Sequence, residues 1–553
     1  MKTFMRLVEQ LEKTNRTNDK LNYLETYFKT ARQEDKVWVI ALFTHRRPRG
    51  VIKLSLLKQW AIELSGLPEW LFQESYYHVG DLAETLSLLG KLPENNVLDN
   101  ERILNQLDSI QGLGDVFDKL LWLKDQEVEV QRSWVLSMWN GLSSMERFVF
   151  NKLLTGGFRI GVSEQLLFKS VARAEGLTAM EVQQRLMGNW KPQEVSYAKL
   201  ILEDLTKNSS VPFPFALCYS LEEVLEDGFD GDFAQQLEHK LGSFSDWQVE
   251  WKWDGIRAQL VKRGDEIWLW SRGEELINDT FPEIMDWQQA IEFDAVLDGE
   301  LLVWQEGVPA SFQHLQRRLG RKRVGKKMMQ EYPVVFMVYD VLELEGTDAR
   351  GMSTRERRKL LARLVERDGI RISPVLTGFG WKDVIDLRMQ SKSLGTEGLM
   401  IKRGDSAYVG GRKRGDWWKW KVAPETVDCV LIYAQRGHGK RASLYTDFTF
   451  AVRDGDKLVP FAKAYSGLTN AELVEINAWL KHHTRESFGP VRSVDAELVF
   501  EVAFEGISLS SRHKSGIAVR FPRIVRWRKD KTVEEIDTLA NILLKLENGS
   551  QSH

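Results

Sequence analysis

The sequence predicts a protein of several domains: an all-α N-terminal domain, a mixed α and β (α+β) middle domain and a small C-terminal β-barrel. First, the chain has 553 residues, enough for about three to four domains of ordinary size. Second, the hydrophobic pattern has a helical period up to about residue 205 and a period of two beyond it. Third, short and closely spaced strand patterns follow from about residue 425. We place the domains at 1–208, 209–424 and 425–540, with a tail over 541–553.

Composition excludes several classes of protein. Hydrophobic residues make up 43% of the chain and charged residues 28%, which is typical of a globular protein and not of a disordered one. The net charge is -3, so any nucleic-acid-binding surface must be local. The two cysteines, Cys218 and Cys429, cannot form a four-cysteine zinc site. No apolar run reaches the ~18 residues that span a bilayer. We therefore expect a cytoplasmic monomer that does not bind membranes.

The N-terminal 208 residues carry the spacing of amphipathic helices. Phe4, Leu7, Val8 and Leu11 lie at i, i+3, i+4 and i+7, which places them on one helical face. The segment 143–146 reads Ser-Ser-Met-Glu, a capping box that begins another helix. Segments of alternating apolar and polar residues are rare in this part. The pattern indicates an all-α domain.

A polar stretch followed by prolines, 207–214, is the predicted linker to the middle domain. Beyond it the residues alternate with the period of strands, and the helical pattern 354–366 lies between two of them. The predicted strands of this domain are 248–253, 266–270, 295–304, 334–342, 398–403 and 417–422.

The C-terminal segment from 425 has shorter strands, at 428–435, 445–452, 458–465 and 497–504, and one helix, at 470–482. About five short strands and one helix are typical of the OB-fold, a small β-barrel.

One lysine of the middle domain has the surroundings of a nucleophile. In the predicted strand 248–253, Glu250 and Lys252 share one face, and apolar residues occupy the other. A turn, Asp254-Gly255, follows, and Arg257 lies just beyond it. A free lysine has a pKa of about 10.4, so a nucleophilic lysine must lose its proton. We expect burial and nearby cations to lower the pKa of Lys252. Alone, this short pattern is more often a surface lysine in a hairpin.

The string Glu-x-Lys-x-Asp-Gly-x-Arg resembles the first motif of the covalent nucleotidyltransferases, and of the multidomain ATP-dependent DNA ligases of bacteria in particular. The resemblance implies that Lys252 attacks the α-phosphate of ATP and becomes adenylylated. It places Glu250 beside the adenine and Arg257 at the nucleotide or at a DNA phosphate. It also makes the three domains a DNA-binding domain, an adenylation domain and an OB-fold domain.

Further strings resemble the later motifs of the same family, in the same order. They are 271–274, 298–301, 336–340, 397–402, 418–421 and 520–531. The resemblance implies the following roles: Arg272, Arg414, Lys419 and Lys421 at phosphate or ribose, Glu300 at the ribose or a metal, Tyr339 stacked on adenine, and Glu397 near Mg²⁺ (or Mn²⁺). The residues that it implies in the last, OB-fold motif are Arg520, Arg523, Arg526, Arg528, Asp530 and Lys531. Each string alone is a common turn, strand or basic run, and only their shared order along the chain makes the resemblance specific.

The implied DNA contacts are electrostatic. A basic cluster at 317–327 contains Arg317, Arg318 and Arg321, and a glycine-rich segment at 156–161 contains Arg159. Either could equally be an ordinary solvated surface or a helix–helix turn. If they contact phosphates, binding weakens steeply with salt. The implied partner is nicked duplex DNA, and a hinge near 423–426 would let the last motif reach the nucleotide.

Rival functions remain open at this stage. An mRNA-capping enzyme shares the lysine motif, but the long helical N-terminal part argues against it. An RNA ligase usually lacks such a C-terminal domain, and an NAD⁺-dependent ligase carries a four-cysteine zinc site. A non-catalytic nick-binding protein would not need the lysines and glutamates described above. DNA repair, replication or recombination are the roles that the resemblance implies, near the nucleoid in a bacterium.

Overall fold

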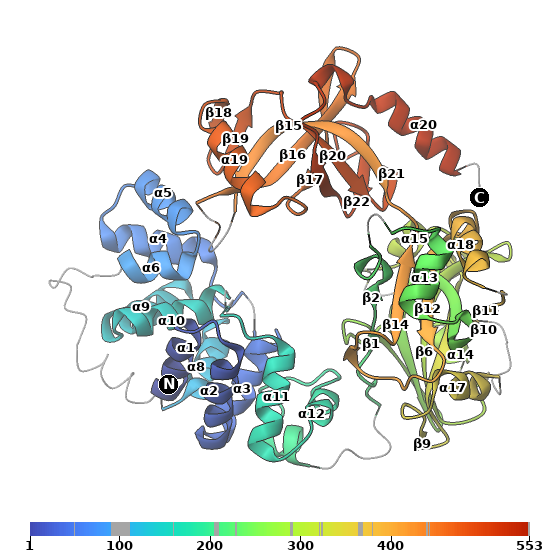
Figure 1. Ribbon diagram of the computed structural model, residues 1–553. Helices are drawn as coiled ribbons and strands as arrows, with labels where there is room; N and C mark the ends of the chain where they lie inside the picture. The colour runs from blue at the N-terminus through green and yellow to red at the C-terminus, as the bar shows by residue number, and fades with distance from the viewer. Residues whose placement is uncertain are drawn as a thin grey trace. The chain divides into compact units, whose positions relative to one another are not determined.

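The computed structural model describes residues 1–48, 50–89, 111–156, 158, 160–203, 210–226, 229–287, 291–319, 321, 324–362, 369–378, 380–437, 441 and 443–550 (Figure 1). The chain divides into two compact units, one formed by 1–167 and 423–553 and the other by 168–422. This division does not separate the N-terminal and C-terminal domains, so the three-domain boundaries stay a prediction. Among the described residues, no helix is both long and apolar enough to cross a membrane.

The N-terminal part of the chain is helical, as predicted. In α1 the residues Phe4, Leu7, Val8 and Leu11 are all buried, as their spacing indicates. The capping box forms at the start of α10, where the Glu146 carboxylate accepts the Ser143 N–H at 3.0 Å. The helices are α1 (Lys2–Glu12), α2 (Thr17–Thr30), α3 (Gln33–Phe43), α4 (Leu54–Ser65), α5 (Glu69–Val79), α6 (Leu82–Leu89), α8 (Leu113–Leu123), α9 (Val128–Gly141), α10 (Ser144–Thr155), α11 (Glu164–Glu175), α12 (Ala179–Arg185) and the π-helix η1 (Ala198–Leu202).

The middle of the chain contains two main sheets, and all six predicted strands lie in them. One sheet has the order β10-β8-β6-β4-β5, with β7 and β9 attached, and the other has the order β11-β3-β12-β14-β2. The strands are β1 (Ala216–Leu217), β2 (Tyr219–Ser220), β3 (Trp247–Trp253), β4 (Ile256–Arg263), β5 (Glu266–Ser271), β6 (Ala295–Gln305), β7 (Val308–Pro309), β8 (Val334–Leu344), β9 (Thr347–Asp348), β10 (Ile370–Ile372), β11 (Val375–Leu376), β12 (Thr396–Arg403), β13 (Gly411–Arg412) and β14 (Trp417–Lys421).

The two faces of β3 differ as the sequence predicts. Trp251 and Trp253 pack into an apolar cluster with Met337 of β8, with Leu237 of α13 (Phe233–Leu241) and with Trp381 of α18 (Trp381–Gln390). Burial of such aromatic side chains is the main source of stability for this sheet. Glu250 and Lys252 alternate with these tryptophans and so lie on the opposite face. The remaining helices are α14 (Ile284–Trp287), α15 (Phe312–Gln316), α16 (Lys326–Glu331) and α17 (Thr354–Leu361), the last within the predicted helix 354–366.

The C-terminal segment is rich in strands, but its described pairings do not close into a barrel. The long strand β15 pairs with β16, β19 and β20, and β20 pairs with β23, which gives an open, branched sheet; β21 and β22 form a separate hairpin. The elements are β15 (Glu425–Arg436), β16 (Tyr445–Asp454), β17 (Lys457–Ala464), α19 (Asn470–Leu480), β18 (Thr484–Phe488), β19 (Val491–Val494), β20 (Val499–Phe504), β21 (Gly506–Leu509), β22 (Ile517–Arg520), β23 (Arg523–Trp527) and α20 (Leu539–Ser550).

Most of the segment expected to be a tail, 541–553, lies in a helix. Helix α20 occupies Leu539–Ser550, and it begins with Leu539 and Ile542 buried in the apolar core of the C-terminal sheet. The apolar residues at the start of this helix have the helical spacing that anchors a terminus. The polar residues at the end of the chain therefore did not indicate the structure of the residues that precede them.

A glycine at the edge of this sheet gives a test of the fold. Gly467 has φ +110°, and a Cβ atom there would lie 1.7 Å from the carbonyl oxygen of Ile524, whose N–H donates to Ser466. Gly455 also has a positive φ, +59°, but open space around its Cβ position. We expect Gly467→Ala to lower the free energy of unfolding by about 2 kcal/mol more than Gly455→Ala, in thermal or urea unfolding of the full chain. Equal losses would contradict the described strand packing.

Candidate active site

Three neighbouring strands bring the predicted lysine, one glutamate and a second lysine together. In the register of the sheet, Lys252 of β3 lies opposite Gly398 of β12, and Gly398 lies opposite Lys421 of β14. The Lys252 ammonium donates a hydrogen bond to Glu397 Oε2. The Lys421 Nζ lies 3.3 Å from the same oxygen. One carboxylate therefore joins two cations that are far apart in the sequence.

A β-bulge turns Glu397 toward Lys252. Thr396 lies opposite Trp253 and Gly398 lies opposite Lys252, so Glu397 is an extra residue in β12. Gly398 has φ +141°, and a Cβ atom there would lie 2.2 Å from the carbonyl oxygen of Trp420. Only glycine fits this backbone. The bulge therefore explains why a Glu-Gly pair begins this strand.

The charges around Lys252 raise its pKa, contrary to our expectation. Burial lowers the pKa of Lys252, but the carboxylates of Glu397 and Glu300 together outweigh it and raise the value above normal. Burial likewise opposes ionisation of Glu397, yet Lys252 and Lys421 lower the pKa of that carboxyl. The sequence pattern suggested nearby cations, whereas the groups nearest the amine are acids. In this structure Lys252 is an ammonium, and it needs to release a proton before it can act as a nucleophile.

Glu300 lies near this pair on β6. Burial raises the pKa of Glu300 to about 8, against the opposing effect of Lys252 and Arg257, and the nearby charges of Glu397 and Asp298 raise it further. The negative charges of Glu300 and Glu397 repel each other, so a cation bound between these carboxyl groups would be stabilised.

Arg257 belongs to a buried network rather than to an open phosphate site. Its Nε and Nη2 donate to the two oxygens of Asp298 at 3.1 and 2.7 Å, and its Nη1 donates to the Ala216 carbonyl at 2.5 Å. Tyr408 and Tyr339 donate to Asp298 at 2.6 and 3.3 Å. Sequence reasoning had assigned no role to Asp298 or Tyr408. One signal could have indicated the role of Asp298. It begins an Asp-Gly-Glu string on β6, and β6 pairs with β4, the strand that carries Arg257.

A second buried pair supports the predicted aromatic. Lys402 donates to Glu250 at 2.8 Å, and each side chain is only 2% exposed. Gln248 donates to the other oxygen of Glu250 at 2.5 Å. The Lys402 Nζ also lies 4.8 Å from the ring centres of both Tyr339 and Trp417. The structure thus brings Glu250 and Tyr339 together through a lysine that had no assigned role.

Three predicted phosphate-binding cations remain available. Arg272 and Arg414 are exposed, and Lys419 is half-buried on β14, where it alternates with tryptophans. Within the described ranges, no hydrogen bond or ion pair engages the side chains of these three residues. These three cations could therefore bind an anionic ligand.

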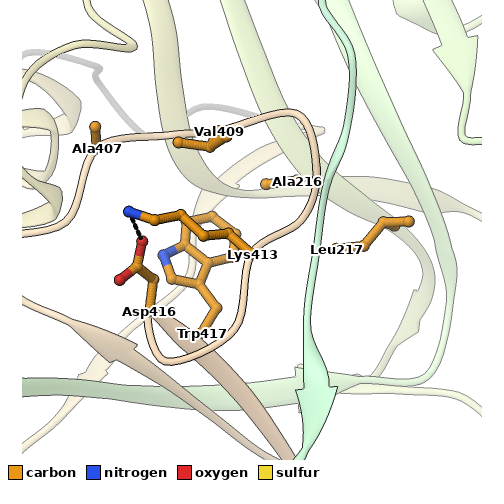
Figure 2. Close-up of a pocket in the computed structure, with 7 residues that line it drawn as sticks. All are labelled: Ala216, Leu217, Ala407, Val409, Lys413, Asp416 and Trp417. Carbon is orange, nitrogen blue, oxygen red and sulfur yellow. Dashed lines mark ion pairs between the residues drawn. The ribbon is translucent and has the colours of Figure 1, made fainter. Parts of the chain in front are cut away.

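A pocket near the Arg257 and Lys402 networks does not contain the predicted catalytic residues. Figure 2 shows its lining, in which the Lys413 ammonium lies 2.6 Å from Asp416. The lining residues are Ala216, Leu217, Ala407, Val409, Lys413, Asp416 and Trp417. It shares Ala216 and Trp417 with the networks described above. The charged cluster around Lys252, not this pocket, is therefore the candidate site.

The structure corrects one of the predicted DNA contacts. Arg318 is fully buried, and its two Nη atoms donate to the carboxylate of Glu283 at 2.6 and 2.7 Å, so it cannot meet a phosphate without leaving the core. Arg317 and Arg321 are exposed, and Arg317 donates to the Tyr332 hydroxyl at 2.5 Å. Arg159 lies outside the described residues.

The predicted OB-fold motif, 520–531, is a basic run. Most of its cations pair with carboxylates of the C-terminal segment from 425. Arg526 lies 2.6 Å from Glu501 and Arg523 lies 3.8 Å from Glu505. Arg528 and Lys531 both pair with Asp428, at 3.1 and 2.6 Å, and Asp530 also pairs with Arg528. The Arg520 guanidinium lies 5.2 Å from the ring centre of Phe521.

Comparisons with known proteins cover most of the chain. Residues 1–172 match the family described as DNA ligase N terminus, residues 232–421 match ATP dependent DNA ligase domain, and residues 441–531 match ATP dependent DNA ligase C terminal region.

Relatives and solved structures agree with these matches. A probable DNA ligase of Koribacter versatilis is 31% identical over 98% of this chain and 95% of its own. A DNA ligase of Archaeoglobus fulgidus is 27% identical over 98% of this chain and 97% of its own. The solved structure named Pmar-Lig_PreS3 covers 95% of this chain and 99% of its own, with 17% identity and a TM-score of 0.56, which indicates the same fold.

Proposed function

Because the chain belongs to the family of ATP-dependent DNA ligases, we propose that it seals nicks in duplex DNA through an adenylyl group carried on Lys252. The observation that carries the proposal is the position of the Lys252 amine, which is half-buried beside Glu397, Glu300 and Lys421. A surface lysine of a hairpin would have none of these neighbours.

The proposed chemistry has three displacements at phosphorus. In the first, the Lys252 Nζ forms a bond to the α-phosphorus of ATP, and the bond to the bridging oxygen breaks, so that pyrophosphate leaves with the electron pair. In the second, an oxygen of the 5′-phosphate displaces Lys252 and takes the AMP. In the third, the 3′-hydroxyl attacks that phosphate and AMP leaves. Positioning and charge neutralisation supply most of the catalysis in such reactions.

The residues around Lys252 have separable tasks. Glu397 Oε2 accepts the hydrogen bond of the amine and so lies where the proton leaves. Lys421 and Lys419 would stabilise charge on the α-phosphate, with Arg272 and Arg414 as further phosphate ligands. Tyr339 would stack on the adenine, next to Glu250 and Lys402. Arg257 acts through Asp298, which it holds in place and which accepts a hydrogen bond from Tyr339.

The carboxylates of Glu300 and Glu397 fit a hard divalent cation. They are oxygen donors of the kind that Mg²⁺ prefers, and Mn²⁺ accepts the same ligands. The raised pKa of Glu300 reflects a burial cost that a nearby cation would reduce. When bound, the metal would neutralise charge on the phosphates.

The other domains have tasks in the same proposed reaction. The C-terminal segment is an OB-fold domain, and its basic motif approaches the nucleotide by a hinge near 423–426. The helical domain 1–208 and the exposed Arg317 and Arg321 contact the duplex. The protein acts as a monomer in the cytoplasm, in DNA repair or replication.

Sealing of a labelled, nicked duplex tests this function. We expect ligation with ATP and a divalent metal. Ligation or labelling with GTP instead of ATP would favour a capping enzyme, and sealing of a nicked RNA alone would favour an RNA ligase. Binding of the nick without sealing would show that the protein is a non-catalytic nick-binding protein.

The bulge at Gly398 predicts a loss of activity from a single methyl group. Gly398→Ala would place a Cβ atom 2.2 Å from the Trp420 carbonyl, which would displace Glu397. We expect about a tenfold to hundredfold slower formation of the adenylylated enzyme, because misplaced catalytic groups lose rate steeply. Gly346→Ala is the matched control, since Gly346 has φ +73° and open space around it. Equal rates in the two variants would contradict the role of the bulge.

The basic segment at 317–321 predicts two different outcomes for neighbouring arginines. Arg321→Ala should weaken DNA binding and reduce the slope of log K against log salt by about 0.9, the contribution of one phosphate contact. Arg318→Ala should leave this slope unchanged but lower the free energy of unfolding by about 3 kcal/mol, since it removes a buried side chain and leaves the partly buried Glu283 without its partner. Binding titrations at several salt concentrations, together with urea unfolding, check both. An unchanged slope in Arg321→Ala would show that Arg321 does not contact a DNA phosphate.

A further inference from the structure

One arginine outside the sheet holds the end of strand β14. Arg388 lies on α18, and its Nε and Nη2 both donate to the carbonyl oxygen of Lys421, at 3.0 and 2.6 Å. Its guanidinium also lies 4.5 Å from the ring centre of Trp420. Arg388 therefore contacts the last two residues of β14.

These hydrogen bonds form where β14 lacks a neighbouring strand on one side. The short strand β2 pairs with β14 only at Trp418 and Lys419, so it does not reach Lys421. The compact unit that contains the site ends at Val422. A carbonyl beyond the last strand pair needs another donor, and residues at the end of a strand otherwise fray. Arg388 supplies two donors to this carbonyl.

On the side of β12, the same end of β14 belongs to the candidate site. Lys421 lies opposite Gly398, and the Val422 N–H donates to the Glu397 carbonyl at 3.0 Å. The Lys421 Nζ lies 3.3 Å from Glu397 Oε2, the oxygen that accepts the hydrogen bond of Lys252. A shift of the Lys421 backbone would therefore move one of the two cations at this carboxylate.

The Arg388 guanidinium has no carboxylate partner that would explain its place. The side chain is half-buried, and burial lowers its pKa against the opposing effect of Glu222. Among the described residues no carboxylate forms an ion pair with Arg388, and its hydrogen bonds go to the Lys421 carbonyl alone. A half-buried cation that donates only to a backbone carbonyl fixes a position of the chain instead of neutralising a charge.

We propose that Arg388 is a positioning residue for the first step: it fixes the end of β14 so that Lys421 stays beside Glu397, where it meets the α-phosphate of ATP. This inference rests on the proposed function. Arg388 acts through the backbone of Lys421 and does not need to touch the nucleotide. A cation that is already in place stabilises the transition state without being ordered during the step, so the benefit belongs to the rate of the step and not to ATP binding.

Single-turnover formation of the adenylylated enzyme, measured over a range of ATP concentrations with the full chain, tests the inference. Arg388→Met keeps an apolar stem beside Trp420 and removes the donors. We expect its maximal rate to fall about tenfold, while KM for ATP stays within about twofold of wild type. Arg388→Lys, whose ammonium can still donate to the carbonyl, should recover part of the rate.

Arg355→Met is the matched control. Arg355 lies on α17 and donates to the carbonyl of Ser245, which precedes β3 at the end away from Lys252. This variant should have a lower melting temperature and an unchanged rate of formation of the adenylylated enzyme. Equal losses of rate in Arg388→Met and Arg355→Met would show a general effect on stability and would overturn the inference.

A double variant shows whether Arg388 acts through Lys421. Arg388→Met combined with Lys421→Met should be little slower than Lys421→Met alone, because both substitutions act on the same ammonium group. Additive losses, a wild-type rate in Arg388→Met, or a rise in KM alone would each overturn the inference. Wild-type protein that forms no adenylylated enzyme would overturn the proposed function itself, so the two failures are distinguishable.

Discussion

Replacing Lys252 with alanine or arginine should abolish formation of the adenylylated enzyme. Alanine removes the attacking nitrogen, and arginine keeps a positive charge but stays protonated and cannot attack phosphorus. We expect labelling from radioactive ATP, and nick sealing with ATP, to fall by at least about a thousandfold. Gel electrophoresis after acid quenching measures the covalent label directly.

The same Lys252 variants carry an internal control. Once AMP is already on the 5′-phosphate, the third step needs no new bond to Lys252. Lys252→Ala should therefore still seal a pre-adenylylated nick, at a reduced rate. Normal labelling of either variant would show that another residue is the nucleophile. Loss of all three steps together with a lower melting temperature would show instead that the variant is misfolded.

Replacing Glu397 should have the next largest effect. This carboxylate accepts the hydrogen bond of Lys252 and pairs with Lys421, and no other carboxylate has an ion pair with Lys252 in the described part of the chain. Glu397→Gln keeps the size of the side chain but removes its charge, so it tests charge and not shape. We expect both Glu397→Gln and Glu397→Ala to slow formation of the adenylylated enzyme by about 10²–10³-fold, the usual effect of losing one pre-organised electrostatic partner.

Glu343→Gln is a matched control for Glu397. Glu343 also forms a partly buried ion pair in the same unit, 3.1 Å from Arg263, but among the described residues it has no ion pair with Lys252. The Glu343→Gln variant should have a somewhat lower free energy of unfolding and an unchanged single-turnover rate of formation of the adenylylated enzyme. If Glu397→Gln kept the wild-type rate, the proposed role of this carboxylate in the first step would be wrong.

The strands and helices that position the site were predictable because their patterns are local. Alternation at 248–253 places Lys252 on one face of β3 and tryptophans on the other, and the structure has this arrangement. The bulge in β12 was not predictable, since it depends on how β12 aligns with β3, a strand about 150 residues earlier. The pairing of the C-terminal strands was not predictable for the same reason: the strands were recognised, but not the open sheet that their described pairings form.

Charge states were the least predictable feature of the site. Lys252 was expected to have a lowered pKa, yet the folded chain brings Glu397 and Glu300 to it, and these raise the pKa. Arg318 looked like a member of an exposed basic run, but it pairs with Glu283 in the core. In each case the deciding partner is distant in sequence, and periodicity contains no information about it.

The most direct test of the account is peptide mapping by mass spectrometry after wild-type protein is incubated with ATP and a divalent metal. We expect a single AMP group, attached to the peptide that contains Lys252 and located on that lysine by fragmentation. AMP on any other residue, or none on a protein that seals nicks, would contradict the assignment of Lys252 as the nucleophile.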